Sequence, residues 1–457
     1  MGRKNFLILI TVFFLIIILT ALLAAVFYGP KTIIVEKEKE DFIFGVSDLE
    51  KEKNRLVFLD DIKEEMIFRR IDFLEANLEE MEVRIYRGGE IVNEVPIIIK
   101  GDPQGWGGSA VGLYRVMSGS KVSFSNTSEV YMPYALHYYG KYYIHGEPYY
   151  SLGSKLDSSI SGGCLRLADS DAETIYYSSE IDMPVLVIDK KRDDYVYPET
   201  DLEDQFPELS AESYLIADLD SGFVFAEKKP EKQLPIASLT KLMTVLVVAE
   251  NVNLKRTISI TEKMLEGYGS TEGIEEGRIY RAVELFYPLL IESSNDAAEA
   301  LSYFLGRNKT IRLMNEKAKA ILMEKTEYAG PSGFDEKNVS TAKDLFYLAR
   351  YILNNRPPIL EITKGKRVLS FGNVNFDIDG FWNKNVFISD PAFVGGKTGF
   401  IVASKCTAVF IFRLKAEQGE ERNIAFILLG SKSSKKDTQK AYLWLQKNYF
   451  PDYNKSL

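Results

Sequence analysis

The sequence predicts three successive parts: an N-terminal membrane-spanning helix, a mostly β domain and an α+β domain. Three observations support this fold class. Residues 6–28 form an apolar run, residues 56–189 carry short strand patterns, and in residues 211–457 strand patterns at both ends enclose a helical middle. Strands and helices segregated along the chain are typical of α+β domains. A chain of 457 residues exceeds one ordinary domain, and 46% hydrophobic residues supply material for several cores.

Residues 1–28 are predicted to be a cytoplasmic tip and a transmembrane anchor. The apolar run of about 23 residues reaches roughly 34 Å as a helix, which is enough to cross a bilayer. A cleaved signal peptide is the alternative, but its apolar region usually has only about 7–15 residues. Arg3 and Lys4 precede the run and predict that the short N-terminal end stays inside. We therefore expect a single-pass membrane protein whose remaining chain is extracytoplasmic.

The segment after the anchor is predicted to be a charged stalk, residues 29–55, followed by the mostly β domain, residues 56–189. Strand patterns begin at residues 55–59 and continue through residues 81–99, where Gly88 and Gly89 indicate a turn. A helical pattern covers residues 168–180. Eight tyrosines fall between Tyr131 and Tyr150, and we interpret them as cross-strand pairs rather than as a sugar-binding platform.

Residues 190–210 are rich in charged residues, tyrosine and proline and lack an apolar period, which predicts a linker between domains. The second domain, residues 211–457, begins with a hairpin pattern whose turn lies at residues 220–222. Strands are expected again around residues 393–412 and 423–430, with a final helix near residues 438–448.

The composition excludes several classes of protein. The chain has two histidines and two cysteines, too few and too scattered for a structural zinc site or a disulfide scaffold, and no cofactor is predicted. A net charge of -9 argues against nucleic acid as a partner. No histidine follows His145, so chemistry in the last two-thirds of the chain must use another base.

The first candidate catalytic group contains His145 and Cys164. A thiol nucleophile needs a base or a cation, and imidazole is the usual base. Gly162 and Gly163 precede the cysteine and allow a substrate backbone to approach, and Arg166 can hold a carboxylate by its planar fork. The alternatives are a buried hydrophobic cysteine and a structural sheet histidine, which would each be favoured if the residues stood alone.

This part of the sequence, residues 68–190, resembles the L,D-transpeptidases of the YkuD type. The resemblance lies in residues 132–134, in Ile144-His145-Gly146, and in residues 161–166. It implies that Cys164 attacks the amide after the L-centre of a tetrapeptide stem with His145 as base. Gly146 would orient the imidazole through its backbone, and substrate would be bound with the help of Ser161 and Arg166.

Two departures from the family pattern stand out. The family places a histidine directly before its Gly-Cys pair, and this chain has Gly162 there. The family's Thr-Pro-x-Gly is replaced by residues 109–112, Ser-Ala-Val-Gly. His137 could fill part of the missing imidazole's space, but we expect it simply to lie on the preceding strand.

The second candidate catalytic group is built on Ser238 and Lys241. Residues 235–248 are apolar nearly all round, which predicts a buried helix. Two residues three apart share one helix face, and the first turn favours a developing anion at Ser238. Apolar surroundings make Lys241 lose its proton more readily, so it can act as base. S-x-x-K alone is common by chance.

Two further motifs strengthen the second group. Ser293 supplies a hydroxyl for proton relay, and Asn295 supplies an amide for the substrate. In the predicted strand around residues 393–400, Lys397 and Thr398 can bind a terminal carboxylate, and neighbouring glycines admit a substrate backbone. Residues 396–398 do not fit a phosphate-binding loop, because that motif needs glycine where the chain has Pro391.

S-x-x-K, S-x-N and K-T-G in this order resemble the penicillin-binding proteins, and in detail the serine D,D-carboxypeptidases of low molecular mass. The resemblance covers residues 211–435 and includes residues 237–244, 294–297, 330–334, 340–344 and 396–400. It implies a penicillin-binding-protein/β-lactamase-like fold, with Ser238 as nucleophile, Lys241 as base and Ser293 as proton shuttle. Substrate would be bound by Asn295, Lys397 and Thr398, and the backbone N–H groups of Ser238 and Phe400 would form the oxyanion hole.

Together the two resemblances imply a membrane-anchored enzyme of peptidoglycan stem peptides that faces the cell wall and is inhibited by β-lactams. One domain would trim D-Ala from pentapeptides, and the other would cross-link the resulting tetrapeptides. Three alternatives stay open. The first domain is a degenerate wall-binding module because of Gly162, the second is a β-lactam sensor or β-lactamase, or the chain is a structural wall anchor.

Overall fold

The computed structural model describes residues 56–126, 128–156, 161–190, 192–197, 205–265, 274–368, 375–416 and 419–450. All of them belong to one compact unit, Val46–Leu457. The predicted anchor and stalk, residues 1–28 and 29–55, lie outside the described residues. Within the ranges given above, no helix combines the length and the apolar character needed to cross a bilayer.

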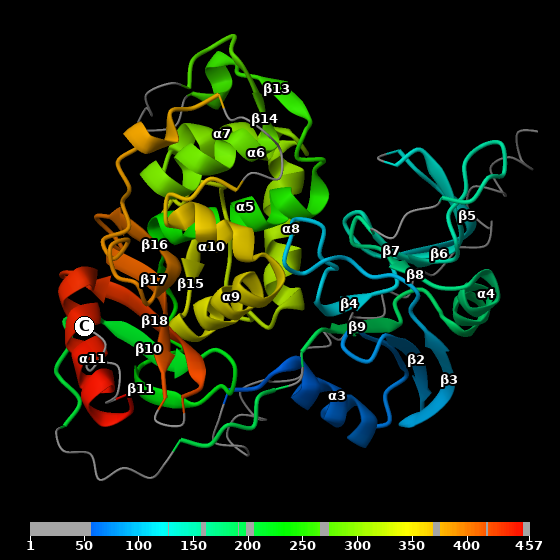
Figure 1. The fold of residues 1–457 in the computed structure, drawn as a ribbon, viewed down its shortest axis with the longest axis horizontal. Coiled ribbons are helices and arrows are strands. Elements are labelled where there is room, and N and C mark those ends of the chain that lie inside the picture. The colour runs from blue at the N-terminus through cyan, green and yellow to red at the C-terminus, as the bar shows by residue number, and fades with distance from the viewer. Residues whose placement is uncertain are drawn as a thin grey trace, which may run out of the picture. The chain divides into compact units, whose positions relative to one another are not determined.

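Two mixed β-sheets make up the first domain (Figure 1). In the first sheet the strand order is β3-β2-β1-β9-β4, and only β1 and β9 run parallel. In the second sheet the order is β5-β6-β7-β8, and only β7 and β8 run parallel. The strands are β1 (Phe73–Asn77), β2 (Glu82–Arg87), β3 (Glu90–Pro96), β4 (Gly112–Arg115), β5 (Ser118–Ser125), β6 (Val130–Tyr139), β7 (Tyr142–His145), β8 (Leu165–Arg166) and β9 (Pro184–Ile188).

Two helices accompany these sheets, α3 (Leu59–Phe68) and α4 (Asp169–Ser178). The helix expected at residues 168–180 is confirmed by α4. The strand expected at residues 55–59 is wrong, because α3 begins at Leu59. The carboxylate of Asp61 accepts the N–H of Phe58 at 2.8 Å, and acidic residues in the first turn stabilise a helix N-terminus. This local capping overrides the strand propensity of the apolar run.

The tyrosine-rich segment forms cross-strand pairs, as expected. Tyr139 is the register partner of Tyr142, and Tyr131 bridges Tyr149 with ring centroids 5.4 Å apart. Stacked rings of this kind bury aromatic surface between neighbouring strands.

The second domain contains a five-stranded antiparallel sheet in the order β11-β10-β18-β17-β16. The predicted hairpin is confirmed: β10 and β11 pair antiparallel around residues 219–223. The long strands expected near the C-terminus are confirmed as well. The strands of the domain are β10 (Ser213–Asp218), β11 (Val224–Lys228), β12 (Leu234–Pro235), β13 (Thr257–Ser259), β14 (Ile279–Arg281), β15 (Val339–Ser340), β16 (Phe393–Ile401), β17 (Lys405–Lys415) and β18 (Glu421–Ser431).

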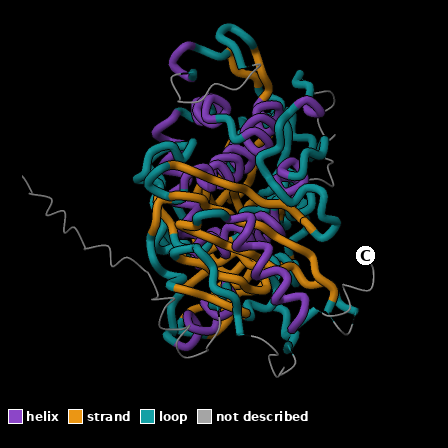
Figure 2. The backbone as a smooth tube through the Cα atoms, turned by 90° about the vertical axis from the view of Figure 1, so that its left-hand side faces the viewer, coloured by secondary structure: helices purple, strands orange, loops and turns teal. Residues whose placement is uncertain are grey.

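Helices occupy the middle of this domain's sequence and its end. Helices α9 and α11 both pack on β18. Alternate residues of a strand face opposite sides, and Ile424, Phe426 and Leu428 form a core cluster with Trp444 of α11. In the turned view the C-terminal helix lies across the strands (Figure 2). The helices are α5 (Thr240–Asn251), α6 (Ala282–Tyr287), α7 (Asn295–Tyr303), α8 (Arg307–Ala320), α9 (Ala342–Asn355), α10 (Pro357–Thr363) and α11 (Ser434–Asn448), with short η1 (Ala237–Leu239), η2 (Glu262–Met264), η3 (Pro288–Glu292) and η5 (Ile378–Gly380).

The segment interpreted as a linker contributes side chains to the core of the second domain. Tyr197 and Leu209 are buried in the cluster that includes Phe426. The Tyr197 hydroxyl donates to the Asp218 carboxylate at 2.8 Å, and Arg422 also binds that carboxylate. These contacts bind the described part of the segment to the sheet.

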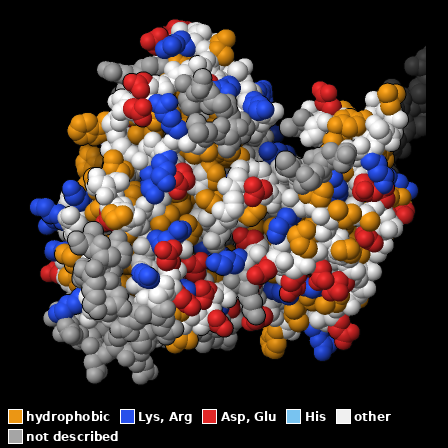
Figure 3. Space-filling model, in the orientation of Figure 1, with side chains coloured by type: hydrophobic (Ala, Val, Ile, Leu, Met, Phe, Trp, Pro, Cys, Tyr) orange, Lys and Arg blue, Asp and Glu red, His pale blue; other side chains and the backbone are white. Residues whose placement is uncertain are grey.

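The visible surface mixes charges of both signs. On the face shown in Figure 3, Lys and Arg side chains alternate with Asp and Glu side chains over both domains. Opposite charges interspersed in this way favour solubility over strong attraction to one kind of polyion.

Candidate active sites

Ser238 and Lys241 meet at the start of the buried helix α5. Ser238 lies in the 3₁₀ turn η1, and Lys241 lies in the first turn of α5. Lys241 Nζ is 3.0 Å from Ser238 Oγ, 2.8 Å from Asn295 Oδ1 and 2.6 Å from the carbonyl oxygen of Ser332. The predicted serine–lysine pair is therefore in direct contact.

The backbone before the serine is strained. Ala237 has φ 49, which is unusual for a residue with a side chain. Gly333 packs on this turn so closely that a Cβ there would lie 1.9 Å from the carbonyl oxygen of Ala237. Strain held by surrounding packing is typical of functional turns.

Burial makes Lys241 a candidate proton acceptor. Its side chain is fully buried, and desolvation holds its pKa well below the usual range, with the positive charge of Lys397 as a further cause. The carboxylate of Glu299 acts in the opposite direction. A neutral amine 3.0 Å from the hydroxyl can take the proton of Ser238.

Ser293 and Lys397 form the opposite side of the site. Ser293 caps η3 with φ 65, and its Oγ accepts a hydrogen bond from Lys397 Nζ at 2.9 Å. Ser294 caps α7, so Asn295 begins that helix and its amide faces Lys241. Short loops and two helix termini thus bring together residues of three separate motifs.

Strand β16 provides the remaining wall. Lys397 is buried, and desolvation together with the charge of Lys384 lowers its pKa to about 7. A Cβ on Gly399 would lie 2.8 Å from the backbone nitrogen of Ser238, so the strand runs directly beside the nucleophile's N–H. Thr398 is half-buried and Phe400 is exposed at this edge. Two N–H groups at such a point can stabilise an oxyanion.

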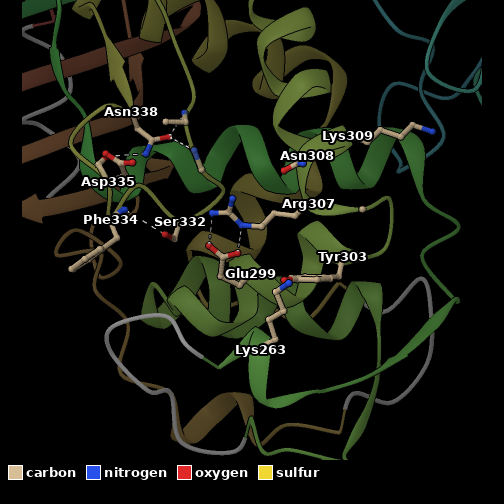
Figure 4. A pocket seen from close by; sticks show the side chains of 13 residues that line it. Lys263, Glu299, Tyr303, Arg307, Asn308, Lys309, Ser332, Phe334, Asp335 and Asn338 are labelled. Carbon is tan, nitrogen blue, oxygen red and sulfur yellow. Dashed lines mark hydrogen bonds and ion pairs between the residues drawn. The ribbon is translucent and has the colours of Figure 1, made fainter.

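A pocket of about 750 Å³ adjoins this site (Figure 4). The Arg307 guanidinium faces the carboxylate of Glu299, and its Nε donates to Glu299 Oε2 at 2.8 Å. Two of the pocket's lining residues also act on Lys241: the carbonyl oxygen of Ser332 accepts from Lys241 Nζ, and the carboxylate of Glu299 raises the pKa of that lysine. The pocket's lining residues are Lys263, Glu299, Tyr303, Gly306, Arg307, Asn308, Lys309, Ala329, Gly330, Ser332, Phe334, Asp335 and Asn338.

The sequence did not assign a role to Ser332. Residues 330–334 belong to the family resemblance, but only the fold shows that the carbonyl of Ser332 accepts from Lys241 Nζ. A backbone acceptor leaves no signal in the side-chain pattern.

His145 ends β7 of the second sheet, and Cys164 immediately precedes the neighbouring strand β8. His145 of β7 is the register partner of Arg166 in β8, and Cys164 precedes Arg166 by two residues. The charge of Arg166 acts on both the imidazole and the thiol. The fold therefore brings these three predicted residues to one place.

The thiol's hydrogen bonds go to the backbone of β7 and of the turn before it. Cys164 Sγ lies 3.6 Å from the carbonyl oxygen of Lys141, and the N–H of Tyr143 donates to the sulfur. Within the described residues, His145 is not among the thiol's hydrogen-bond partners. Burial raises the pKa of Cys164, while the N–H of Tyr143 and the charges of Lys141 and Arg166 act against this rise.

His145 is buried and held in one orientation. Its Nδ1 lies 2.6 Å from the carbonyl oxygen of Gly146, which assigns the proton to Nδ1 and leaves Nε2 free to accept one. Burial lowers the pKa of His145 to about 4, so the ring is neutral at pH 7. A Cβ on Gly146 would lie 2.5 Å from Asp169 Oδ1, so α4 closes directly over this turn.

The turn before Cys164 is held by Ser161. Ser161 Oγ donates to the carbonyl of Cys164 at 2.6 Å and accepts the N–H of Gly163 at 3.1 Å. Gly163 has φ 114, and a Cβ there would lie 2.2 Å from the Tyr142 ring, so this position requires glycine. Gly162 differs, because a Cβ there would meet open space.

The chain's other histidine and cysteine are His137 and Cys406. His137 lies on β6, as expected, and stacks on Tyr143 with ring centroids 4.7 Å apart. Cys406 is only half-buried on β17, so the expectation that it is a core residue is wrong.

Two family models and several curated proteins match parts of the chain. Residues 200–432 match the family model described as D-alanyl-D-alanine carboxypeptidase, and residues 72–187 match the L,D-transpeptidase catalytic domain. A D-alanyl-D-alanine carboxypeptidase of Mycobacterium tuberculosis is 31% identical over 207 residues, which are 44% of this chain and 70% of the relative. A D-alanyl-D-alanine endopeptidase of Haemophilus influenzae is 32% identical over 232 residues, which are 49% of this chain and 77% of the relative.

A solved structure of a D-alanyl-D-alanine carboxypeptidase from Mycobacterium tuberculosis aligns with a TM-score of 0.47 at 27% identity, covering 54% of this chain and 95% of that one. The first family model spans just over half of the sequence. The chain therefore belongs to the D-alanyl-D-alanine carboxypeptidase family, with an L,D-transpeptidase catalytic domain fused ahead of the peptidase domain.

Proposed function

We propose that this protein is a bifunctional enzyme of peptidoglycan stem peptides, a serine D,D-carboxypeptidase and a cysteine L,D-transpeptidase in one chain. The observation that carries the proposal is the serine site, where a buried lysine nitrogen lies 3.0 Å from Ser238 Oγ. The second activity is supported by the family match of residues 72–187 and by the grouping of Cys164, His145 and Arg166.

In the serine reaction, Lys241 takes the proton of Ser238 as Oγ attacks the carbonyl between the two terminal D-Ala residues. The N–H groups of Ser238 and Phe400 stabilise the oxyanion, and Ser293 passes a proton to the leaving amine. Lys397 and Thr398 bind the terminal carboxylate, and Asn295 holds the peptide backbone. Water then hydrolyses the acyl-enzyme. β-Lactams acylate Ser238 by the same attack.

In the thiol reaction, His145 takes the proton of Cys164 through Nε2, and the sulfur attacks the amide after the L-centre of a tetrapeptide. The terminal D-Ala leaves, and the amine of a second stem resolves the thioester into a cross-link. The carbonyl of Gly146 orients the imidazole, and Ser161 holds the turn before Cys164. Arg166 binds the substrate. Burial raises the pKa of Cys164 and favours the protonated thiol, so the attack needs a base, and we assign that role to the neutral imidazole of His145.

The two reactions can follow one another. Removal of D-Ala from a pentapeptide produces the tetrapeptide that the thiol site consumes, and both sites are held in one chain. Tethering raises the local concentration of the intermediate at the second site. We place this enzyme at the membrane, anchored by residues 1–28, with both catalytic domains facing the cell wall; the apolar run and its positive flank support this location.

Mass spectrometry of purified muropeptides tests the proposal. Incubation of pentapeptide muropeptides with the purified protein is expected to give tetrapeptides first and cross-linked dimers later. A product that retains all pentapeptides would contradict the serine activity. Cleavage of pre-formed cross-links would instead assign the endopeptidase reaction for which the Haemophilus relative is named.

Replacement of Gly162 by histidine tests whether the thiol site is only weakened or is degenerate. Open space at the Cβ position allows Gly162→His to be accommodated, and a nearby imidazole favours the thiolate. We expect an increase of about 10-fold in alkylation of Cys164 by iodoacetamide at pH 7, measured in a Cys406→Ala background. Gly162→Ala is the control and should stay at the starting rate; equal rates for both would mean that the lost imidazole is irrelevant.

The pH dependence of the serine site follows from Lys397. Its pKa of about 7 means that the cation is present below pH 7 and is lost above it. Since the cation binds the substrate carboxylate, kcat/KM for D-Ala release should fall by about 10-fold per pH unit above pH 7. Lys397→Arg keeps its charge to much higher pH and should remove this fall. A flat wild-type profile between pH 7 and 9 would contradict the assignment.

A further inference from the structure

A buried charged network joins the two catalytic domains. Glu250 at the end of α5, Lys317 of α8 and Arg356 before α10 have fully buried side chains. Lys317 Nζ and Arg356 Nη2 lie 3.2 and 3.0 Å from the two oxygens of Glu250. All three residues belong to the peptidase domain, yet both cations also bind groups of the transpeptidase domain.

Lys317 and Arg356 contact different parts of the transpeptidase domain. Lys317 Nζ donates to the Tyr114 hydroxyl on β4 at 2.8 Å. Arg356 Nη2 donates to the Tyr142 hydroxyl on β7 at 3.1 Å and to the carbonyl oxygen of Gly108 at 2.7 Å. The lysine thus binds the first sheet, whereas the arginine binds groups next to the thiol.

The two groups of the transpeptidase domain that accept from Arg356 are the two that enclose Gly163. A Cβ on Gly163 would lie 2.2 Å from the Tyr142 ring and 2.9 Å from the carbonyl oxygen of Gly108. Gly163 immediately precedes Cys164, so one guanidinium nitrogen binds both walls of the turn that presents the nucleophile.

Tyr142 also determines where the thiol's hydrogen bonds lie. The thiol donates to the carbonyl oxygen of Lys141 and accepts a hydrogen bond from the N–H of Tyr143. Lys141 and Tyr143 are the residues on either side of Tyr142. A side chain fixed at Tyr142 therefore fixes the backbone groups that meet the sulfur. Burying a guanidinium removes its hydration, so a buried arginine is weak evidence for stability alone and suits a role in fixing one geometry.

We propose that Arg356 of the peptidase domain is a positioning residue of the thiol site, holding Tyr142 and Gly108 around the Gly163–Cys164 turn. The transpeptidase site is then complete only when the peptidase domain is docked on it. This inference rests on the proposed function of Cys164, but its test reads the thiol's reactivity and does not need cross-linking to occur.

Two matched substitutions test the inference in the full chain with Cys406→Ala. Arg356→Met leaves Glu250 paired with Lys317, and Lys317→Met leaves Glu250 paired with Arg356, so each variant removes one buried cation and keeps one buried ion pair. Only Arg356→Met frees Tyr142 and Gly108. Alkylation of Cys164 by iodoacetamide across pH 6–10 gives both the limiting rate and the thiol's apparent pKa.

We expect Arg356→Met to lower the alkylation rate at neutral pH by about 10-fold or more, since displacing a reactive group by ~1 Å has effects up to about 100-fold. Its apparent thiol pKa should rise as the N–H of Tyr143 moves away. Lys317→Met should stay within about two-fold of the starting protein. Acylation of Ser238 by a fluorescent penicillin reports folding of the peptidase domain and should stay within about two-fold in both variants.

An unchanged rate in Arg356→Met, or an equal loss in both variants, overturns the proposal; the second result would mean that the interface acts only through general stability. If Arg356→Met loses penicillin binding at Ser238, Tyr142→Phe carries the test, because it keeps the ring and removes only the acceptor hydroxyl. It should slow alkylation by about three-fold or more, as expected for loss of one hydrogen bond, and an unchanged rate there overturns the proposal as well. Absence of cross-linking in the wild type would refute the proposed function without affecting these rates.

Discussion

Replacement of Ser238 by alanine is expected to abolish release of D-Ala from pentapeptide muropeptides, with a fall in kcat of at least about 10⁴-fold. The hydroxyl is the group that Lys241 contacts at 3.0 Å, and alanine leaves no atom to form the acyl-enzyme. The measurement is quantification of tetrapeptide product by mass spectrometry over time. Acylation by a fluorescent penicillin should disappear in the same variant.

Cys164→Ala is the control for this experiment, because it removes the other nucleophile and leaves the serine site intact. It should release D-Ala at the wild-type rate. Tetrapeptide formation by Ser238→Ala at an undiminished rate would show that the trimming reaction takes place at the thiol, and would remove the serine from the mechanism. A penicillin adduct that hydrolyses rapidly in the wild type would favour the β-lactamase alternative.

The sequence predicted the serine site well because its parts are short motifs whose residue types determine their chemistry. Ser238, Lys241, Ser293, Asn295 and Lys397 all meet within hydrogen-bond distance of another member. The absence of histidine from this domain also favoured a lysine base. What these motifs could not reveal is the backbone around them, such as the carbonyl of Ser332.

The thiol site was predictable to a lesser degree. The pairing of β7 with β8 leaves His145 at the end of β7 and Cys164 directly before β8, but the sulfur's own partners are backbone groups of residues 141 and 143. Main-chain contacts depend on strand register and leave no pattern of residue types. Asp169, which lies against Gly146, escaped notice for a similar reason, since it reads simply as an acidic residue at a helix start.

Contacts between the domains were entirely outside the reach of sequence reasoning. Lys317 lies in a helix with many other charged residues, Glu250 lies near the end of a mostly apolar helix, and Arg356 lies between two helices. A charged residue in such a place is usually solvent-exposed. Only the fold shows that these three are buried together. Helix α3 illustrates the opposite problem: the apolar residues 56–59 predicted a strand, but the chain there leads into a helix that Asp61 caps with its side chain.

Replacement of Cys164 by alanine is expected to abolish cross-linking of tetrapeptide muropeptides, again by at least about 10⁴-fold in rate, because no thioester can form. D-Ala release from pentapeptides should be unchanged, so tetrapeptides should accumulate as monomers. The measurement is the ratio of cross-linked dimers to tetrapeptide monomers by mass spectrometry, after incubation of pentapeptide muropeptides with each variant.

Cys406→Ala is the matched control, since it removes the chain's other thiol, which lies on β17 of the peptidase domain with its sulfur 3.9 Å from the carbonyl oxygen of Lys432. Its dimer yield should equal that of the wild type. If Cys164→Ala cross-links normally, the thiol is not the nucleophile. The wall-binding alternative predicts instead that neither the wild type nor Cys164→Ala forms dimers and that both bind tetrapeptide muropeptides with the same Kd, whereas a catalytic thiol site predicts dimers from the wild type and none from Cys164→Ala.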